Sequence, residues 1–194
     1  MRNNFLIIGI PRSGTTSLMK SIASANELPY IFEPFRRGIK KFEINNIVFK
    51  TQLSQIDDEY YTEIVDEPHL EKCVEFYTEF SKQFDKTILI VRNNIIENAQ
   101  SLSVQNNGME ERSKYVYYPE LYNETAEKLI DKIKLINQYM LILSNNLKID
   151  IDKYEDVYYG NGLIDKSIKL DNSILDNSKK YRQYDSNLNN RNLI

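Results

Sequence analysis

The residues best suited to chemistry stand near the start of the chain, in the stretch GIPRSGTTS that begins at Gly9. Gly9 and Gly14 have the spacing of a phosphate-binding loop, whose backbone N–H groups surround phosphate oxygens. Thr16 supplies the hydroxyl expected in such loops, but Thr15 stands where they carry a lysine, and the cation is Arg12, inside the loop. The stretch therefore predicts an anion site without the lysine that neutralises a transferring γ-phosphoryl group.

A second cation follows a strongly apolar segment, TILIV, which ends at Val91. Nucleotide hydrolases with this type of loop usually have an aspartate at the end of another strand to hold Mg²⁺, whereas Arg92 follows here. An arginine at that place would repel a metal and attract a further phosphate, because its planar fork can donate two parallel hydrogen bonds. We therefore expect a doubly anionic nucleotide and no required metal.

The elements that would position these residues alternate along the chain. The apolar run Phe5–Ile10 leads into the glycine loop and suits a buried parallel strand, and the apolar spacing over 15–26 predicts a helix. Alternation of this kind predicts an α/β fold, a P-loop-containing three-layer sandwich with a central, mostly parallel β-sheet flanked by helices. The other expected elements are strands over 30–33, 46–50, 87–91 and 148–151 and helices over 69–84, 95–108 and 119–146.

Polar residues follow the expected strands at five places. The glycine loop comes after Ile8, and the other four positions are Glu33, Lys50, Arg92 and Tyr154. The carboxyl ends of parallel strands meet at one edge of a sheet, and α/β proteins bind their ligands there. We therefore expect a single site at this edge.

Composition narrows the class of protein. The 194 residues, 41% of them hydrophobic and 27% charged, suit one domain, 1–194. A formal charge of −3 argues against binding nucleic acid through bulk charge, and one cysteine and one histidine cannot form a zinc cluster or an internal disulfide. The short apolar run near the start predicts neither a transmembrane segment nor a signal peptide, so we expect a cytoplasmic protein.

The loop resembles that of sulfotransferases that use 3′-phosphoadenosine 5′-phosphosulfate (PAPS). Pro11–Thr16 match their Pro-(Lys/Arg)-Ser-Gly-Thr-Thr loop, while Arg92 and Ser101 match the arginine and serine that bind the 3′-phosphate. Tyr154 opens YEDV, which is similar to the segment whose tyrosine lies near the adenine. The resemblance implies PAPS as donor and 3′-phosphoadenosine 5′-phosphate (PAP) as product. The nucleotide-binding residues that it implies are Pro11, Arg12, Ser13, Gly14, Thr15, Thr16, Ser17, Arg92, Ser101 and Tyr154, with Ser103 replacing Ser101 if the register differs.

The same resemblance implies the residues of the reacting centre. Lys50 begins KTQL, which is similar to the Lys-Thr-His-Leu segment of cytosolic sulfotransferases, so Lys50 and Arg12 are the expected catalytic cations. The histidine of that segment is the general base, but Gln52 stands there and has no useful basicity. Glu33 is the expected catalytic base, because bacterial and carbohydrate-type members have a glutamate in a comparable place. His69 stands at an expected helix start beside a proline, and we expect it to be exposed and uninvolved.

The acceptor side of the site is less defined. A basic cluster after Glu33 is either a solvated loop or a surface for an acidic acceptor, and the segment 105–118 is a second candidate wall. Three basic residues near the end of the chain could replace the late Arg-Lys-Gly loop of cytosolic members. The basic residues concerned are Arg36, Arg37, Lys40 and Lys41 in the cluster and Lys179, Lys180 and Arg182 near the end.

The expected function is transfer of a sulfuryl group from PAPS to a hydroxyl or amine of a small-molecule, glycan or lipid acceptor. The chain is short for the family, so an oligomer in which a second subunit completes the acceptor pocket is one expectation. Two alternatives stay open: a P-loop nucleotide kinase or hydrolase, and a nucleotide-binding module that has lost catalysis.

Overall fold

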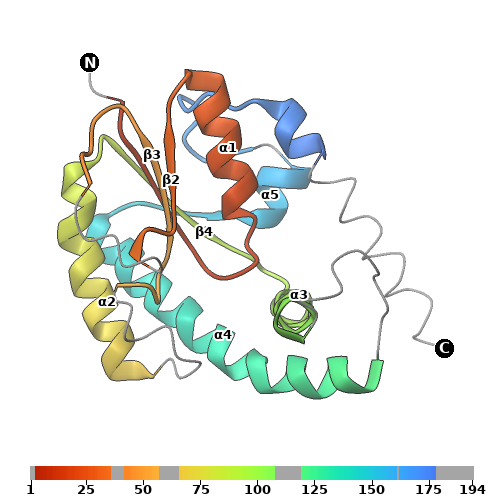
Figure 1. The fold of residues 1–194 in the computed structure, drawn as a ribbon. Helices are drawn as coiled ribbons and strands as arrows, with labels where there is room; N and C mark the ends of the chain where they lie inside the picture. Colours follow the sequence, from red (N-terminus) through yellow and green to blue (C-terminus); the bar gives the residue numbers. More distant parts are fainter. Residues whose placement is uncertain (1–2, 36–41, 57–65, 108–118, 161, 178–194) are drawn as a thin grey trace.

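A five-stranded sheet, in the order β2-β3-β1-β4-β5, lies at the centre of the computed structural model (Figure 1). Every neighbouring pair of strands is parallel, which confirms the predicted α/β fold. The structure describes residues 3–35, 42–56, 66–107, 119–160 and 162–177. Its elements are β1 (Phe5–Gly9), α1 (Thr15–Asn26), β2 (Tyr30–Phe32), β3 (Val48–Gln52), α2 (Glu67–Phe80), a 3₁₀ helix (Ser81–Gln83), β4 (Lys86–Val91), α3 (Ile95–Asn107), α4 (Pro119–Leu147), β5 (Ile151–Lys153) and α5 (Tyr154–Tyr159).

Helices cover both faces of the sheet, so the molecule has the three layers predicted (Figure 1). Side chains alternate along a strand, and β1 is buried throughout, so its residues serve two cores. Leu6 and Ile8 pack in the core on the side of α2 and α4, whereas Phe5 and Ile7 pack with residues of α1 and α5. A strand buried on both faces reads as a continuous apolar run, which is why β1 was predictable from its sequence.

Three elements, α2, β3 and β5, differ from their expected bounds by two residues or more. The side chain of Asp66 accepts a hydrogen bond from the backbone N–H of His69 at 3.0 Å and starts α2 two residues early. Strand β3 is shifted by two residues toward Gln52. The predicted strand over 148–151 is wrong, because the chain leaves α4 through Lys148 in a left-handed conformation (φ 56°) and pairs only from Ile151.

The strand order places the glycine loop between two neighbouring strand ends. Gly9, the last residue of β1, lies opposite Gln52 of β3 on one side and Ile90 of β4 on the other. Figure 1 shows the loop running from β1 to α1 beside α3.

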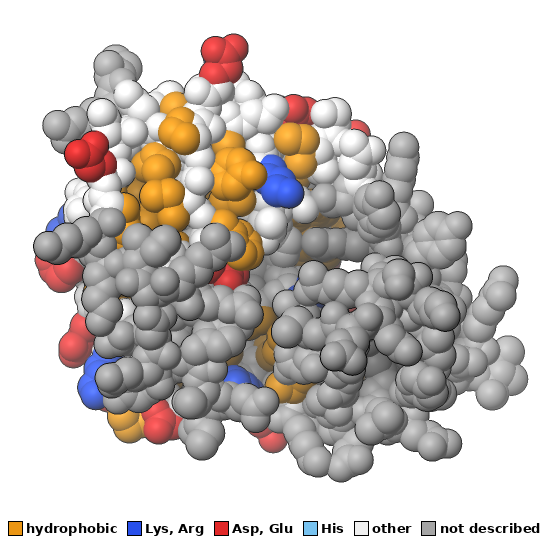
Figure 2. All heavy atoms as spheres, in the orientation of Figure 1, with side chains coloured by type: hydrophobic (Ala, Val, Ile, Leu, Met, Phe, Trp, Pro, Cys, Tyr) orange, Lys and Arg blue, Asp and Glu red, His pale blue; other side chains and the backbone are white. Residues whose placement is uncertain are grey.

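In the view of Figure 2, apolar side chains gather over β2 and α1. None of the helices in the described ranges is both long and apolar enough to cross a membrane.

Candidate functional site

The glycine loop is tightly folded, and its two glycines are required by geometry. A Cβ added to Gly9 would lie 2.3 Å from the Cγ2 atom of Thr15. Gly14 has a φ of 80°, a left-handed conformation, and a Cβ there would lie 2.6 Å from the ring of Tyr158. The Tyr158 hydroxyl donates a hydrogen bond to the Gly14 carbonyl oxygen at 2.6 Å, and the Ser13 hydroxyl donates to Ile10 at 2.8 Å. The loop is therefore held in one shape before any ligand binds.

This loop leaves the N-terminus of α1 open to an anion. Gly14 is the N-cap residue and provides no side-chain cap. The first backbone N–H groups of a helix have no intrahelical acceptor, and together with the helix dipole they favour a phosphate. Arg12 adds an exposed cation to the loop, with φ 63°. The anion site stays a prediction, which the uncapped start of α1 supports.

We expect Gly14→Ala to damage both the fold and the anion site. The new Cβ has to adopt a positive φ and displaces the buried Tyr158 ring, so the free energy of unfolding should fall by about 1–3 kcal/mol. Thermal unfolding measures this loss, and Gly162→Ala is the matched control. Gly162 also has a positive φ, of 81°, but the nearest atom to its added Cβ is 4.0 Å away. Equal destabilisation by both substitutions would contradict a packing role for Tyr158 at the loop.

Helix α3 is tied to the loop by two side chains. The Nε atom of Arg12 donates a hydrogen bond to the hydroxyl of Ser101 at 2.8 Å, and the Asn98 amide donates to the Pro11 carbonyl oxygen at 3.0 Å. Asn98 is fully buried, and its Oδ1 atom has no hydrogen-bond partner in the described part of the chain. Asn98 was not among the predicted residues, although its place three residues after Ile95 put it on the inward face of the helix.

Arg92 follows β4 as expected and is mostly buried, with 14% of its side chain exposed. Its Nη2 atom lies 2.6 Å from the Glu97 carboxylate, and its guanidinium carbon lies 5.0 Å from the centroid of the Tyr154 ring. Its Nε atom is buried without a hydrogen-bond partner in the described ranges. The structure thus brings Arg92 and Tyr154 together, while the recorded hydrogen bond of Ser101 is to Arg12.

Glu155 fixes the loop that carries Arg92. Its two carboxylate oxygens accept hydrogen bonds from the backbone N–H groups of Asn93, at 3.1 Å, and Asn94, at 3.2 Å. Glu155 lies in the first turn of α5. Its carboxylate also links α5 to the start of α3. This link holds Tyr154 next to Arg92.

Glu33 and Lys50 form a buried ion pair, and each side chain is almost fully shielded from solvent. The Gln52 amide donates to one Glu33 carboxylate oxygen at 2.9 Å, and the Gln55 amide donates to the other at 3.4 Å. Burial alone would raise the pKa of Glu33, but the charge and hydrogen bond of Lys50, aided by Gln55 and Gln52, hold it below its ordinary value. The Lys50 ammonium also lies 4.6 Å from the centroid of the Phe32 ring.

Lys50 was expected at a strand end but is the third residue of β3. Lys50 and Gln52 lie on the same face of the strand, because side chains alternate along it. Val48 lies on the same face of β3 as Lys50 and Gln52, and it packs with residues of α1 and α5. The side chains of Lys50 and Gln52 therefore lie on the face of the sheet that α1 covers. The pair of Glu33 and Lys50 lies on this face as well.

Tyr77 of α2 fixes the turn that follows β3. Its hydroxyl is buried, lies 2.7 Å from the Thr51 hydroxyl, and donates to the carbonyl oxygens of Gln52, at 3.1 Å, and Gln55. Burial raises the pKa of Tyr77 well above its ordinary value, so the phenol stays a neutral donor. This anchor sets the positions of the two glutamine side chains that hold Glu33.

The expectation that His69 is exposed is wrong. The early start of α2 turns His69 inward, where it is 4% exposed and its Nε2 atom lies 2.9 Å from the Ser54 carbonyl oxygen. The Sγ atom of Cys73 lies 3.4 Å from the same nitrogen. Burial raises the pKa of Cys73 to about 12, so its thiol is not a nucleophile at neutral pH. Both side chains pack behind the turn after β3.

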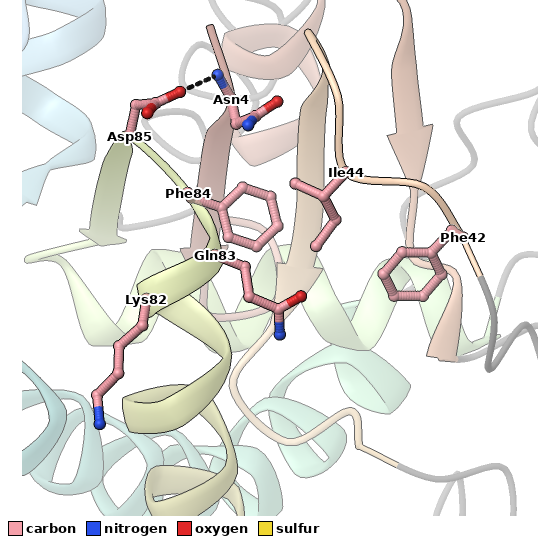
Figure 3. A pocket seen from close by; sticks show the side chains of 7 residues that line it. All are labelled: Asn4, Phe42, Ile44, Lys82, Gln83, Phe84 and Asp85. Atoms are coloured by element: carbon pink, nitrogen blue, oxygen red, sulfur yellow. Dashed lines mark hydrogen bonds between the residues drawn. The ribbon is translucent and has the colours of Figure 1, made fainter. Parts of the chain in front are cut away.

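A hollow of about 430 Å³ lies at the opposite edge of the sheet, before the starts of β1 and β4 (Figure 3). Figure 3 shows the backbone N–H of Asn4 donating a hydrogen bond to the Asp85 carboxylate, at 2.9 Å, at this edge. The hollow shares no residue with the loop site. Its lining residues are Asn4, Phe42, Ile44, Lys82, Gln83, Phe84 and Asp85.

Several predicted residues lie outside what the structure describes. They are the basic cluster over 36–41, most of the acceptor wall over 105–118, the side chain of Ser103, and the residues Lys179, Lys180 and Arg182. Within the described residues, no group of three His, Cys, Asp or Glu side chains is arranged to hold a metal ion.

Comparison with models of known protein families gives no match, and no curated protein is significantly similar in sequence. The resemblance to PAPS-dependent sulfotransferases therefore depends on the motif residues alone.

Proposed function

We propose that this protein is a PAPS-dependent sulfotransferase. The observation that carries the proposal is the placement of Arg92, a mostly buried arginine over the Tyr154 ring. Its Nε atom has no hydrogen-bond partner among the residues that the structure describes. A nucleotide kinase or hydrolase would need an acidic metal ligand at this strand end. The uncapped N-terminus of α1 and the exposed Arg12 provide donors for one phosphate, and Arg92 provides donors for a second, so the residues present fit a nucleotide with phosphates at two places.

Each part of the donor has a counterpart among these residues. The N-terminal amides of α1 and Arg12 would hold the 5′-phosphosulfate, and Arg92 would hold the 3′-phosphate with Tyr154 near the adenine. The bound donor supplies an activated sulfuryl group. Transfer of such a group depends mainly on positioning and on stabilising charge, so the protein needs fixed cations and a proton acceptor.

Glu33 is the proposed proton acceptor, and Lys50 controls its basicity. While the ion pair is intact, the Glu33 carboxylate binds a proton weakly. A Lys50 ammonium that turns toward the transferring group leaves the buried carboxylate without its cation, which raises the pKa of Glu33. Glu33 can then take the proton of the acceptor hydroxyl or amine.

The same ion pair favours the second candidate, a nucleotide-binding module without chemistry, because a neutralised carboxylate is a poor base. A transfer assay with labelled PAPS and a panel of hydroxyl and amine acceptors distinguishes a sulfotransferase from a binding module. A binding module would hold PAP and transfer nothing to any acceptor.

Titration calorimetry without Mg²⁺ tests the proposed nucleotide. We expect PAP to bind more tightly than 5′-AMP, and Arg92→Gln to weaken PAP binding about 10- to 100-fold while changing 5′-AMP binding little. Lys134→Gln, which removes an exposed cation from α4, is the control. Equal affinity for PAP and 5′-AMP, or ATP turnover that requires Mg²⁺, would contradict the proposal.

A further inference from the structure

The Arg92 guanidinium is already occupied by a carboxylate of its own chain. Glu97, in the first turn of α3, places Oε2 at 2.6 Å from Nη2 of Arg92. The two partners are unequally exposed, because 44% of the Glu97 side chain but only 14% of the Arg92 side chain is accessible. Glu97 therefore reaches the arginine from the solvent side of the site.

Arg92 is held independently of Glu97. Its guanidinium lies over the Tyr154 ring, and Tyr154 is fixed by the contact of Glu155 with the Asn93 and Asn94 amides. The backbone of Glu97 is fixed separately, since its N–H donates to the Asn94 side chain at 3.1 Å. The Glu97 carboxylate can therefore leave Arg92 through rotation of its side chain alone, and neither α3 nor Arg92 has to move.

A phosphate and the Glu97 carboxylate would compete for one cation. The guanidinium offers its donors in a planar fork, and a phosphate monoester near neutral pH carries more negative charge than a carboxylate. The buried Nε atom, which Glu97 does not satisfy, gives a phosphate an additional donor. A ligand with a phosphate here should displace Glu97, whereas a nucleotide without one gains nothing from displacing it.

We propose that Glu97 is a displaceable internal ligand of Arg92, which leaves when a nucleotide 3′-phosphate binds and returns when it departs. The inference rests on the proposed function, because it takes the 3′-phosphate as the natural partner of Arg92. Glu97 thereby lowers the affinity for the nucleotide product and speeds its release. Glu155, the other acidic side chain near this loop, is not the competitor, since its carboxylate is bound by two backbone amides.

Glu97→Gln tests the proposal, because it keeps the size of the side chain and removes its charge. We expect PAP to bind the variant about 5- to 10-fold more tightly, through slower dissociation, with no change for 5′-AMP. Glu79→Gln is the matched control: it removes an equal charge from an exposed pair with Lys82 and should leave both affinities unchanged.

Stopped-flow dissociation and calorimetry distinguish the outcomes. One outcome concerns Glu97 alone: the wild-type protein binds PAP and Arg92→Gln weakens that binding, but Glu97→Gln binds PAP no more tightly than the wild-type protein does. This outcome would overturn the role of Glu97 and leave the proposed function standing. An equal gain in affinity for 5′-AMP would also overturn that role, because the gain would then be a general effect of charge. Failure of the wild-type protein to bind PAP would instead overturn the proposed function, and this inference with it.

Discussion

Replacing Lys50 by methionine is expected to lower the free energy of unfolding by about 3–5 kcal/mol at neutral pH. The substitution keeps most of the volume of the side chain but leaves the Glu33 carboxylate buried without its cation. Two amide donors, from Gln52 and Gln55, remain and do not neutralise the charge. Urea unfolding followed by circular dichroism measures the loss.

The pH dependence of this loss has a defined sign. In the wild-type protein the pKa of Glu33 is lowered, so the ion pair contributes stability above the ordinary carboxyl pKa of 4.5, and that contribution disappears as the pH falls through the lowered value. In Lys50→Met, burial raises the pKa of Glu33, so the carboxyl takes up a proton on mild acidification. The difference in stability between the two proteins should therefore shrink from pH 7 toward pH 4.5.

The double variant Lys50→Met with Glu33→Gln is the control. It removes both charges and keeps a polar group for the two glutamines, so it should recover most of the stability lost in Lys50→Met. A double variant as unstable as Lys50→Met, or a loss that does not depend on pH, would show that the ion pair is not what stabilises this edge of the sheet.

Glu33→Gln is expected to reduce sulfuryl transfer about 10²- to 10⁴-fold, which corresponds to roughly 3–5 kcal/mol of barrier. A neutral amide cannot take the proton of the acceptor, although it fills the same space. PAP binding should change little, because the nucleotide residues lie in the loop and at Arg92. Transfer from labelled PAPS, with an acceptor that the wild-type protein uses, gives the rate.

Glu33→Gln also leaves Lys50 buried without its partner, so the fold has to be checked separately. PAP affinity and the unfolding curve show how much of the variant is native, and the double variant provides a folded protein that lacks the base. Wild-type transfer rates in either folded variant would remove Glu33 from the mechanism and leave the loop and Arg92 as a binding site only.

The fold was largely predictable because its inner strands are buried over most of their length. Strands β1 and β4 lie side by side within the sheet, and each contains a continuous apolar run, residues 5–8 in β1 and residues 88–91 in β4. The short outer strands were less well defined, because three residues carry little periodicity. Strand β5 was misplaced for a further reason: where α4 ends depends on the left-handed Lys148, which no apolar pattern reveals.

The site was only partly predictable. The glycine loop, Arg92 and Tyr154 could be placed together because they follow neighbouring parallel strands. The burial of the Glu33 and Lys50 pair could not be predicted, because it depends on the pairing of β2 with β3 and on Gln55 in the turn after β3. The contact of Glu97 with Arg92 was missed because a charged residue in the first turn of a helix is more often explained by the helix dipole.

A crystal structure of the protein with PAP bound tests the central claim most directly. Our account predicts the 5′-phosphate on the N-terminal amides of α1 and the 3′-phosphate on Arg92, with the Glu97 carboxylate moved away and Lys50 and Glu33 facing the 5′ end. A nucleotide bound elsewhere, such as in the hollow at the opposite edge of the sheet, or a 3′-phosphate without contact to Arg92, would contradict the account.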